Sequence, residues 1–398
     1  MTSLTFESSD SGGKPGPQHR VLIVAGLVLA TLALLAWQNG GSRLVGALLL
    51  GALGGLALYH AAFGFTAAWR RMARERRGAG LRAQFLLIGL VILISFPLLG
   101  YGREIGLPTG GFVFPFGISA ALGAAAFGLG MQLAGGCGSG TLFTVGGGST
   151  RMVVALAAFI FGSLVATAHM PFWNSLPRVS GTSVITLLGV EGALLASLAL
   201  LAGLWQLTRW LERRQHGDLE PARPRGSLLR GPWPLAWGAL LLALVSVGTF
   251  LVLGRPWGIT SAFALWGAKI AGGLGVPVET WSYWQGQTAA LERSVFHDAT
   301  SVMNFGVIVG AFAAAGLAAR FAPVWRLSRR DLLTALAGGF LMGYGARLAW
   351  GCNIGGFLGG VVSASLHGWW WLLFGYLGSS LGVGLRARLG MDPPLPKS

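Results

Sequence analysis

The sequence predicts an all-α polytopic membrane protein with about ten transmembrane helices, arranged as two inverted-topology five-helix repeats with re-entrant glycine-rich segments. Hydrophobic residues make up 53% of the 398 residues and charged residues only 11%, whereas soluble proteins carry about 25% charged residues. Apolar runs long enough to cross about 30 Å of hydrocarbon recur along the chain. A cysteine-containing motif also occurs twice, which indicates an internal duplication.

Ten apolar segments predict membrane-spanning helices, with ends uncertain by a few residues. They are 20–37, 43–59, 83–100, 116–135, 151–169, 183–206, 234–253, 302–320, 332–350 and 367–385. A further stretch, 258–275, holds Lys269 and several glycines among its apolar residues. We therefore expect a re-entrant or partial helix there rather than a full span.

The basic residues predict which side of the membrane each loop faces. The net charge is +16, and basic loops stay on the cytoplasmic side of membrane proteins. With both termini in the cytoplasm, 22 of the 29 Lys and Arg residues fall in cytoplasmic parts. This predicts a multi-pass protein with an even number of spans in the lipid bilayer of the bacterial inner (cytoplasmic) membrane. It also accounts for the positive charge without nucleic acid, which we exclude as a partner.

The spans and the duplication divide the chain into four parts. Residues 1–19 are polar and rich in Ser, Gly and Pro, which predicts a disordered cytoplasmic tail. The first inverted repeat covers 20–182. The second covers 183–390 and includes a basic cytoplasmic loop at 207–232, and residues 391–398 form a second cytoplasmic tail.

The duplication rests on two motifs that return in the same order. The segment GFTAAW at 64–69 returns as GITSAF at 258–263, and the pattern G-x-G-x-x-L-A-x-G-C-x-x-G occurs at 128–140 and again at 343–355. With five spans in each half, the second copy enters the membrane upside down relative to the first. Glycine-rich backbone cannot face lipid, because its unpaired N–H and C=O groups would be costly there. We therefore expect the two cysteine motifs to meet near the membrane midplane.

Each copy of the longer motif carries one of the two cysteines in the chain. A thiol is a weak donor and a soft contact, flanking glycines let a ligand approach the backbone, and a helix that begins after each cysteine would favour an anion. The predicted substrate-binding residues are Cys137, Cys352, Gly136, Gly138, Gly351, Asn353 and Arg347. Lone cysteines lack metal-site spacing, so we expect no metal, no cofactor and no catalytic residue. A structural disulfide and a purely apolar role remain alternatives.

Arg347 would add a positive charge to this site. It lies within the predicted span 332–350, five residues before Cys352, and an intramembrane arginine is a functional-site candidate. The alternative is that its side chain reaches an interface or bonds carbonyl groups at a helix end. The corresponding residue of the first repeat is the neutral Gln132, so this charge would be confined to one half.

The repeated L-A-x-G-C-x-x-G, together with GARLAWGCN at 345–353 and Ser365-Leu366-His367, resembles the YeeE/YedE family of bacterial inner-membrane proteins, most closely its longer YedE-type members. The resemblance covers approximately residues 43–385. It implies uptake of thiosulfate or a related sulfur anion, held transiently at Cys352 as the outer station and Cys137 as the inner one, without covalent change. It also implies a small cytoplasmic sulfur carrier of the TusA type as a candidate partner, and one branch of the family is linked to selenium.

One departure from the family pattern bears on the substrate. Relatives often carry a third cysteine where this chain has Gly64, so either two stations suffice or the substrate differs from thiosulfate. We expect a transporter and not an enzyme. The alternatives are a membrane-embedded sulfurtransferase or thiol enzyme, a transporter of a selenium compound, and a scaffold for a carrier protein docked on the basic loops 70–82 and 209–230.

Overall fold

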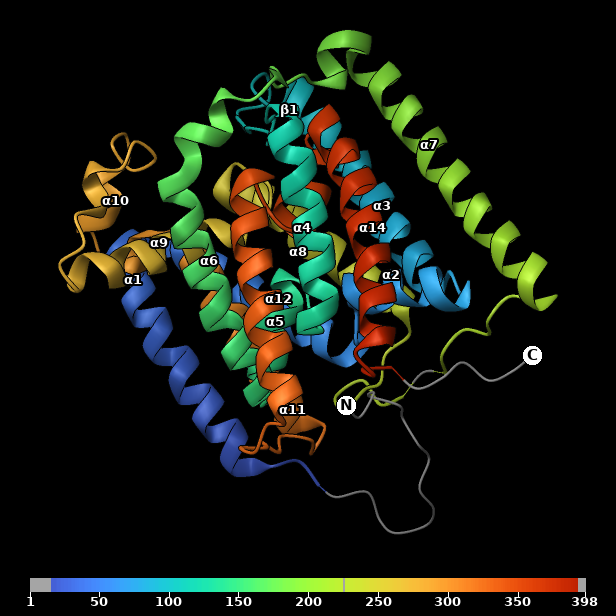
Figure 1. Cartoon of the computed structure of the whole chain (residues 1–398), viewed down its shortest axis with the longest axis horizontal. Coiled ribbons are helices and arrows are strands. Elements are labelled where there is room, and N and C mark those ends of the chain that lie inside the picture. Colours follow the sequence, from blue (N-terminus) through green and yellow to red (C-terminus); the bar gives the residue numbers. More distant parts are fainter. Residues whose placement is uncertain (1–15, 225, 393–398) are drawn as a thin grey trace.

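Helices make up most of the computed structural model, which describes residues 16–392 apart from residue 225 (Figure 1). In chain order the elements are α1 (His19–Ala61), α2 (Phe65–Glu75), α3 (Ala79–Tyr101), β1 (Phe116–Gly117), α4 (Ile118–Ala134), α5 (Gly138–Gly146), α6 (Thr150–Ser175), β2 (Arg178–Val179), α7 (Val184–His216), α8 (Leu235–Leu253), α9 (Thr260–Gly273), η1 (Val278–Thr280), α10 (Thr288–Glu292), η2 (Val295–His297), α11 (Ala299–Leu317), α12 (Arg329–Leu348), η3 (Asn353–Leu358), α13 (Gly359–Val361) and α14 (Leu366–Arg388). The predicted tails 1–19 and 391–398 lie largely outside the described residues.

Eight helical segments of the described chain are long and apolar enough to cross a membrane. The prediction of an all-α polytopic membrane protein is therefore confirmed. Each of the ten predicted spans overlaps a helix, and the first two both lie in α1. The helix α14 carries the tenth predicted span but is not among the eight segments, so the count of ten stays a prediction. The stretch 258–275 forms the 14-residue α9, which is too short for a full span, as expected.

The two predicted spans within α1 are separated by a reversal at Gly40 and Gly41. These residues leave the helical conformation, with φ of −173° and 61°, and a positive φ is readily adopted only by glycine. Val21 of the first leg and Gly55 of the second both lie near the C-terminal half of α11, whereas Ala36 and Leu44 cluster with Val302 at its start. The two legs therefore run alongside α11 in opposite directions.

Corresponding helices of the two halves pack antiparallel. In α4 and α12, Gly123 lies beside Leu348, and further along Gly130 lies beside Gly338. The second leg of α1 and the helix α8 show the same arrangement, with Gly46 near Val252 and Ala61 near Gly238. Opposite directions in equivalent helices are what an inverted duplication requires. The contacts support the predicted repeat.

Glycines allow the helices to approach very closely. Gly51 and Gly55 of α1 face the backbone of α11, and Gly306 and Gly310 of α11 face the backbone of α1. A Cβ atom at any of these four positions would overlap a backbone atom of the other helix. Spacings of four residues between small side chains are typical of helix pairs in membranes, where close packing replaces the hydrophobic effect.

The central bundle contains α4, α6, α12 and α14, and α7 and the first leg of α1 lie at its margins (Figure 1). The two-stranded ribbon of β1 and β2 is antiparallel, with Phe116 opposite Val179. It joins the start of α4 to the segment between α6 and α7. Because each strand has only two residues, the helices of the bundle position the functional site.

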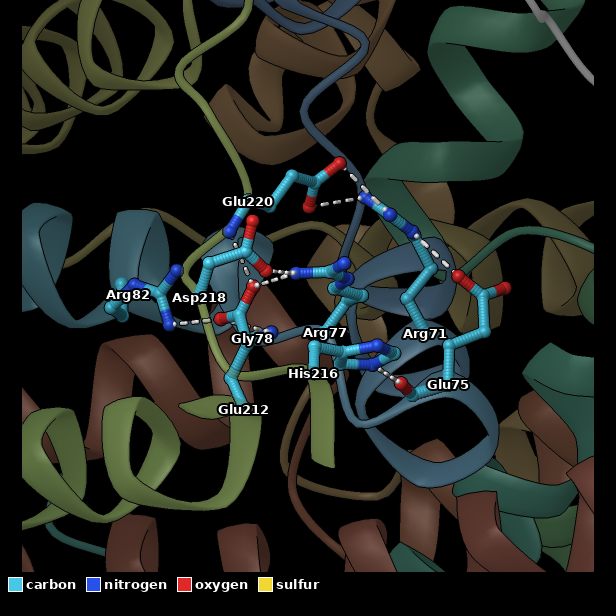
Figure 2. Close-up of polar contacts among 9 residues, drawn as sticks. All are labelled: Arg71, Glu75, Arg77, Gly78, Arg82, Glu212, His216, Asp218 and Glu220. Carbon is cyan, nitrogen blue, oxygen red and sulfur yellow. Dashed lines mark hydrogen bonds and ion pairs between the residues drawn. The ribbon is translucent and has the colours of Figure 1, made fainter. Parts of the chain in front are cut away.

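Basic side chains gather with a few carboxylates at one end of the bundle, which the charge distribution predicts to be cytoplasmic. Here Glu212 of α7 accepts hydrogen bonds from Arg82 at 2.6 Å and Arg77 at 3.3 Å (Figure 2). Arg71 of α2 binds both oxygens of Glu220. Three arginines of the predicted docking loop 70–82 are therefore paired with carboxylates of the predicted docking loop 209–230.

Candidate functional site

Each cysteine lies at a break between a long helix and a short one. Cys137 separates α4 from α5, and Cys352 separates the end of α12 from η3 and α13. Their backbones are nearly identical, with φ and ψ of −85° and −165° at Cys137 and −94° and −167° at Cys352. Each carbonyl oxygen accepts a hydrogen bond of 2.7 Å from the fourth residue along, Thr141 or Gly356. A short helix therefore begins after each cysteine, as expected.

The glycine before each cysteine makes the same close contact in both halves. A Cβ atom on Gly136 would lie 3.2 Å from the carbonyl carbon of Gly140. The equivalent atom on Gly351 would lie 2.5 Å from the nitrogen of Gly356. A larger residue at position 351 would push the cysteine loop away from its short helix, whereas at position 136 the neighbouring backbone would have to shift by a few tenths of an ångström. These glycines shape the loops, which is a more specific role than simply leaving space for a ligand.

The two cysteine loops meet inside the bundle. A Cβ atom on Gly138, the first residue of α5, would lie 2.9 Å from the Sγ of Cys352. Both thiols are buried, with exposures of 1% for Cys137 and 0% for Cys352. Neither cysteine is in a disulfide, so that alternative is wrong. The structure thus brings Cys137, Gly138 and Cys352 together, as the inverted repeat predicted.

Asn353 adds a polar group with no partner next to Cys352. Its side chain is fully buried, and neither of its amide atoms has a hydrogen-bond partner among the described residues. Leaving a buried amide unpaired is costly unless a ligand satisfies it. On the other side, the hydroxyl of Ser139 lies 3.5 Å from the Sγ of Cys137. Polar donors therefore accompany both thiols.

Arg347 is 8% exposed and bonds side chains on two other elements. Its Nη2 donates to the Thr260 hydroxyl at 3.1 Å and its Nη1 donates to the Tyr283 hydroxyl at 3.0 Å. Its Nε has no described partner. Thr260 also lies 3.6 Å from a Cβ placed on Gly138, so one side chain links Arg347 to the meeting point of the loops. Through its described contacts Arg347 bonds side-chain hydroxyls and not helix-end carbonyls.

Gln132, the neutral counterpart of Arg347, makes an equivalent contact in the first half. Gln132 is fully buried and donates from Nε2 to the carbonyl of Thr66 at 3.0 Å and to the hydroxyl of Ser379 at 2.8 Å. Thr66 and Thr260 occupy the same place in the shorter repeated motif. An amide in one half and a guanidinium in the other thus contact equivalent threonines. Positive charge also lies near the Cys137 side, where the buried Arg386 donates to the carbonyl of Gln132 at 2.6 Å.

Three residues at the site were not predicted from the sequence. Tyr283 comes from the loop after α9 and contacts Arg347. Trp371 of α14 is fully buried and donates from its indole to the carbonyl of Gly351 at 3.1 Å. Trp350 adopts a φ of 58°, a strained value for a large side chain, and stacks on Phe114 with ring centroids 5.2 Å apart. The repeat offered one signal, because Trp350 stands where the first half has Gly135, which also has a positive φ.

Gly64, which replaces the third cysteine of many relatives, lines a separate cavity at the predicted cytoplasmic end. A Cβ atom there would meet no described atom within 4 Å. The side chain of a cysteine would therefore find open space at this position.

Comparison with known proteins places this arrangement in a family. A profile described as "Sulphur transport" matches residues 60–381. The chain is 26% identical over 355 residues to the "Thiosulfate transporter TsuA" of Escherichia coli (strain K12), an alignment that covers 85% of this chain and 93% of that protein. It is 27% identical over 279 residues to the "Thiosulfate transporter TsuA" of Spirochaeta thermophila, which covers 65% of this chain and 74% of that protein.

A shorter alignment joins the chain to a third relative. It is 34% identical over 151 residues to the "Probable transporter YedE" of Salmonella typhimurium, covering 38% of this chain and 37% of that protein. The matched part therefore spans less than two fifths of the YedE length. Because the family profile covers most of the chain and includes both cysteine motifs, the chain belongs to the Sulphur transport family, as its resemblance to YeeE/YedE proteins predicted.

Proposed function

We propose that the chain carries a sulfur-containing anion, thiosulfate, across the bacterial inner membrane through the meeting point of its two cysteine loops. The observation that carries the proposal is the contact of Gly138 with the Sγ of Cys352. It brings the first turn of α5 against the second thiol, so that an anion leaving one station would already touch the other. The names of the two TsuA relatives support thiosulfate as the substrate.

The buried groups suit a soft oxyanion. Thiosulfate presents a polarisable sulfur, which matches a thiol, and oxygens that accept hydrogen bonds from the Asn353 amide and from backbone N–H groups at the start of each short helix. The N–H groups of Ile354 and Gly355 face the Cys352 sulfur in the structure. The positive charge of Arg347 favours an anion on the Cys352 side. Each contact is weak on its own, and weak binding at successive sites allows an ion both to arrive and to leave.

In this proposal Cys352 binds the ion first, from the periplasmic side, and Cys137 passes it toward the cytoplasm. The thiols act as donors and keep their S–H bonds, so the protein transports without chemical change to its cargo. Both termini lie in the cytoplasm, where the basic residues gather. The domain division at 182/183, and a carrier protein of the TusA type as partner, extend the same proposal.

The experiment is uptake of radiolabelled thiosulfate by cells that lack other thiosulfate transporters. Expression of the chain should restore both uptake and growth on thiosulfate. Sulfate, sulfite, selenite and selenate, added in excess, would identify the preferred anion through their competition. Uptake no greater than in cells with an empty vector would refute the proposal. A persulfide found on either cysteine during turnover would instead indicate a sulfurtransferase.

A further inference from the structure

A small polar cavity lies beside the turn between α1 and α2, away from the cysteine loops. It is lined by Gly64, Arg71, Gln84 and Arg223 together with small and apolar residues, and its volume is about 60 Å³. Two guanidinium groups at one small cavity would repel each other unless an anion lay between them. In the structure that anion is a carboxylate of the protein.

Glu220 supplies this carboxylate. Its two oxygens accept hydrogen bonds from Nη1 and Nη2 of Arg71, both at 2.9 Å (Figure 2). Arg223 lies within the electrostatic influence of the same pair. Burial lowers the pKa of the Arg223 guanidinium, the charge of Glu220 raises it and the charge of Arg71 lowers it. A paired carboxylate offers an arginine two oxygens in the same way as a sulfur oxyanion does.

The segment that carries Glu220 also contributes Arg223 to the lining of the cavity. This segment, 217–234, links α7 to α8. Its first part is held where the Glu220 nitrogen donates to Glu212 at 2.8 Å. Its later part is held where Arg223 donates to the carbonyl of Ala61 at 3.2 Å and the Trp233 nitrogen donates to the carbonyl of His60 at 2.9 Å. It therefore passes beside the turn between α1 and α2, which contains Gly64.

Aromatic side chains connect this cavity to the cysteine site. Phe65 follows Gly64 and packs edge-on against Phe357, with ring centroids 6.2 Å apart. Phe357 belongs to η3, the short helix that begins after Cys352. The turn that lines the cavity is therefore one ring contact away from the short helix that follows Cys352.

We propose that Arg71 and Arg223 form an exit site for the transported sulfur oxyanion, and that the Glu220 carboxylate keeps this site closed until the anion displaces it. The inference rests on the proposed function, since it needs an anionic cargo. It assigns a role to the segment between α7 and α8, in which a carboxylate that resembles the cargo closes the site as a gate. Arg71, whose side chain is 38% exposed and which also pairs with Glu75 at 3.1 Å, keeps an ion-pair partner while one anion replaces another.

Accessibility of a cysteine introduced as Gly64→Cys tests the gate. The two natural thiols are buried, so the wild-type chain gives the background rate of labelling by a membrane-impermeant maleimide in inside-out vesicles. Glu220→Gln in the Gly64→Cys chain removes a charge-assisted pair and should raise the labelling rate about tenfold. Thiosulfate should accelerate labelling of the Gly64→Cys chain itself, and chloride at equal ionic strength should not.

A second carboxylate of the same segment provides the matched control. Asp218 pairs with Arg77 at 3.5 Å and its side chain is 73% exposed, so Asp218→Asn makes the same change in charge without touching Arg71. It should label at the rate of the Gly64→Cys parent. Equal labelling of the Glu220→Gln and Asp218→Asn chains, or no acceleration by any sulfur oxyanion, would overturn the inference.

Uptake of radiolabelled thiosulfate by the same chains separates the two proposals. If the parent takes up thiosulfate while Glu220→Gln leaves labelling unchanged, the gate is wrong and the proposed function stands. If the parent takes up no thiosulfate but sulfite or sulfate opens the cavity in a way that depends on Glu220, the gate stands and thiosulfate is wrong.

Discussion

Gly138 lies directly against the sulfur of Cys352, although 214 positions separate the two residues in the sequence. A Cβ atom on Gly138 would stand 2.9 Å from that sulfur and 3.2 Å from the Cβ of Cys352. A side-chain carbon cannot approach a sulfur atom this closely. Only glycine, whose side chain is a single hydrogen atom, fits at the point where the two halves touch. The contact explains why the residue after Cys137 is a glycine, whereas the residue after Cys352 is an asparagine.

Gly138→Ala should lower thiosulfate uptake about tenfold, because a methyl group placed against the Cys352 thiol costs about 1–3 kcal/mol through overpacking. Radiolabelled uptake, normalised to the amount of protein in the membrane, measures this effect. Gly26→Ala is the matched control, since a Cβ there meets no described atom within 4 Å. Uptake that falls equally in both variants would show that the effect is not specific to the site.

Asn353→Leu should lower transport without lowering the stability of the protein. An unpaired buried amide costs about 1–3 kcal/mol, so an apolar side chain of similar size should maintain or raise the melting temperature of the detergent-purified protein. If the amide binds the cargo, uptake should nevertheless fall. Loss of both stability and uptake would indicate that Asn353 has a structural partner instead of a ligand.

Gly310→Ala should destabilise the pair formed by α1 and α11. The added Cβ would overlap the carbonyl oxygen of Ala52, and because both atoms belong to rigid elements, the helices must move apart at a cost of about 1–3 kcal/mol or more. Thermal unfolding in detergent measures this cost. Gly203→Ala in α7 meets no described atom and should leave the melting temperature near that of wild type, so equal effects would refute the close-packing argument.

Asp392 should stabilise the end of α14 in a pH-dependent way. Burial opposes its charge, but the hydrogen bonds and positive charge of Arg386 outweigh that effect and hold the pKa of the Asp392 carboxyl below its ordinary value of 3.8. Because the pKa is lowered in the folded state, the contribution is complete above that ordinary value and is lost as the pH falls through the lower, folded one.

Asp392→Asn should therefore lower the melting temperature at pH 7, and the difference from wild type should shrink as the pH falls below about 3.8. The exposed Asp218 provides a control, because Asp218→Asn should change stability by less than about 1 kcal/mol at either pH. A difference between Asp392→Asn and wild type that persists undiminished into the acid range would contradict the role assigned to the Arg386 pair.

The helices could be predicted from the sequence because each is a long apolar run with polar or glycine-rich ends. The ten predicted spans overlap helices with boundaries close to those observed, such as 234–253 for α8. The reversal within α1 was also foreseen, since the apolar runs on either side of Gly40 and Gly41 were predicted as separate spans. Local patterns were sufficient here because lipid imposes the same requirement on every crossing.

Only those residues of the candidate site that belong to the duplicated motifs could be predicted from the sequence. The repeat placed Cys137 and Cys352 at equivalent helix breaks and implied that they would meet. It could not predict the contact of Arg347 with Tyr283, because Tyr283 lies in a loop with no counterpart in the first half. Nor could it predict that Glu220 binds Arg71, because that pair depends on the path of a segment without periodicity. Such contacts are set by tertiary packing rather than by local sequence.

The most direct test of the account compares thiosulfate uptake by Cys137→Ala and Cys352→Ala with that of wild type, each normalised to folded protein in the membrane. We predict that each single variant loses at least about 90% of uptake, because transfer between two stations in series fails when either is missing. Both variants should still fold, since alanine fills most of the same buried space. Wild-type uptake in both single variants would contradict the central claim that the two thiols carry the anion.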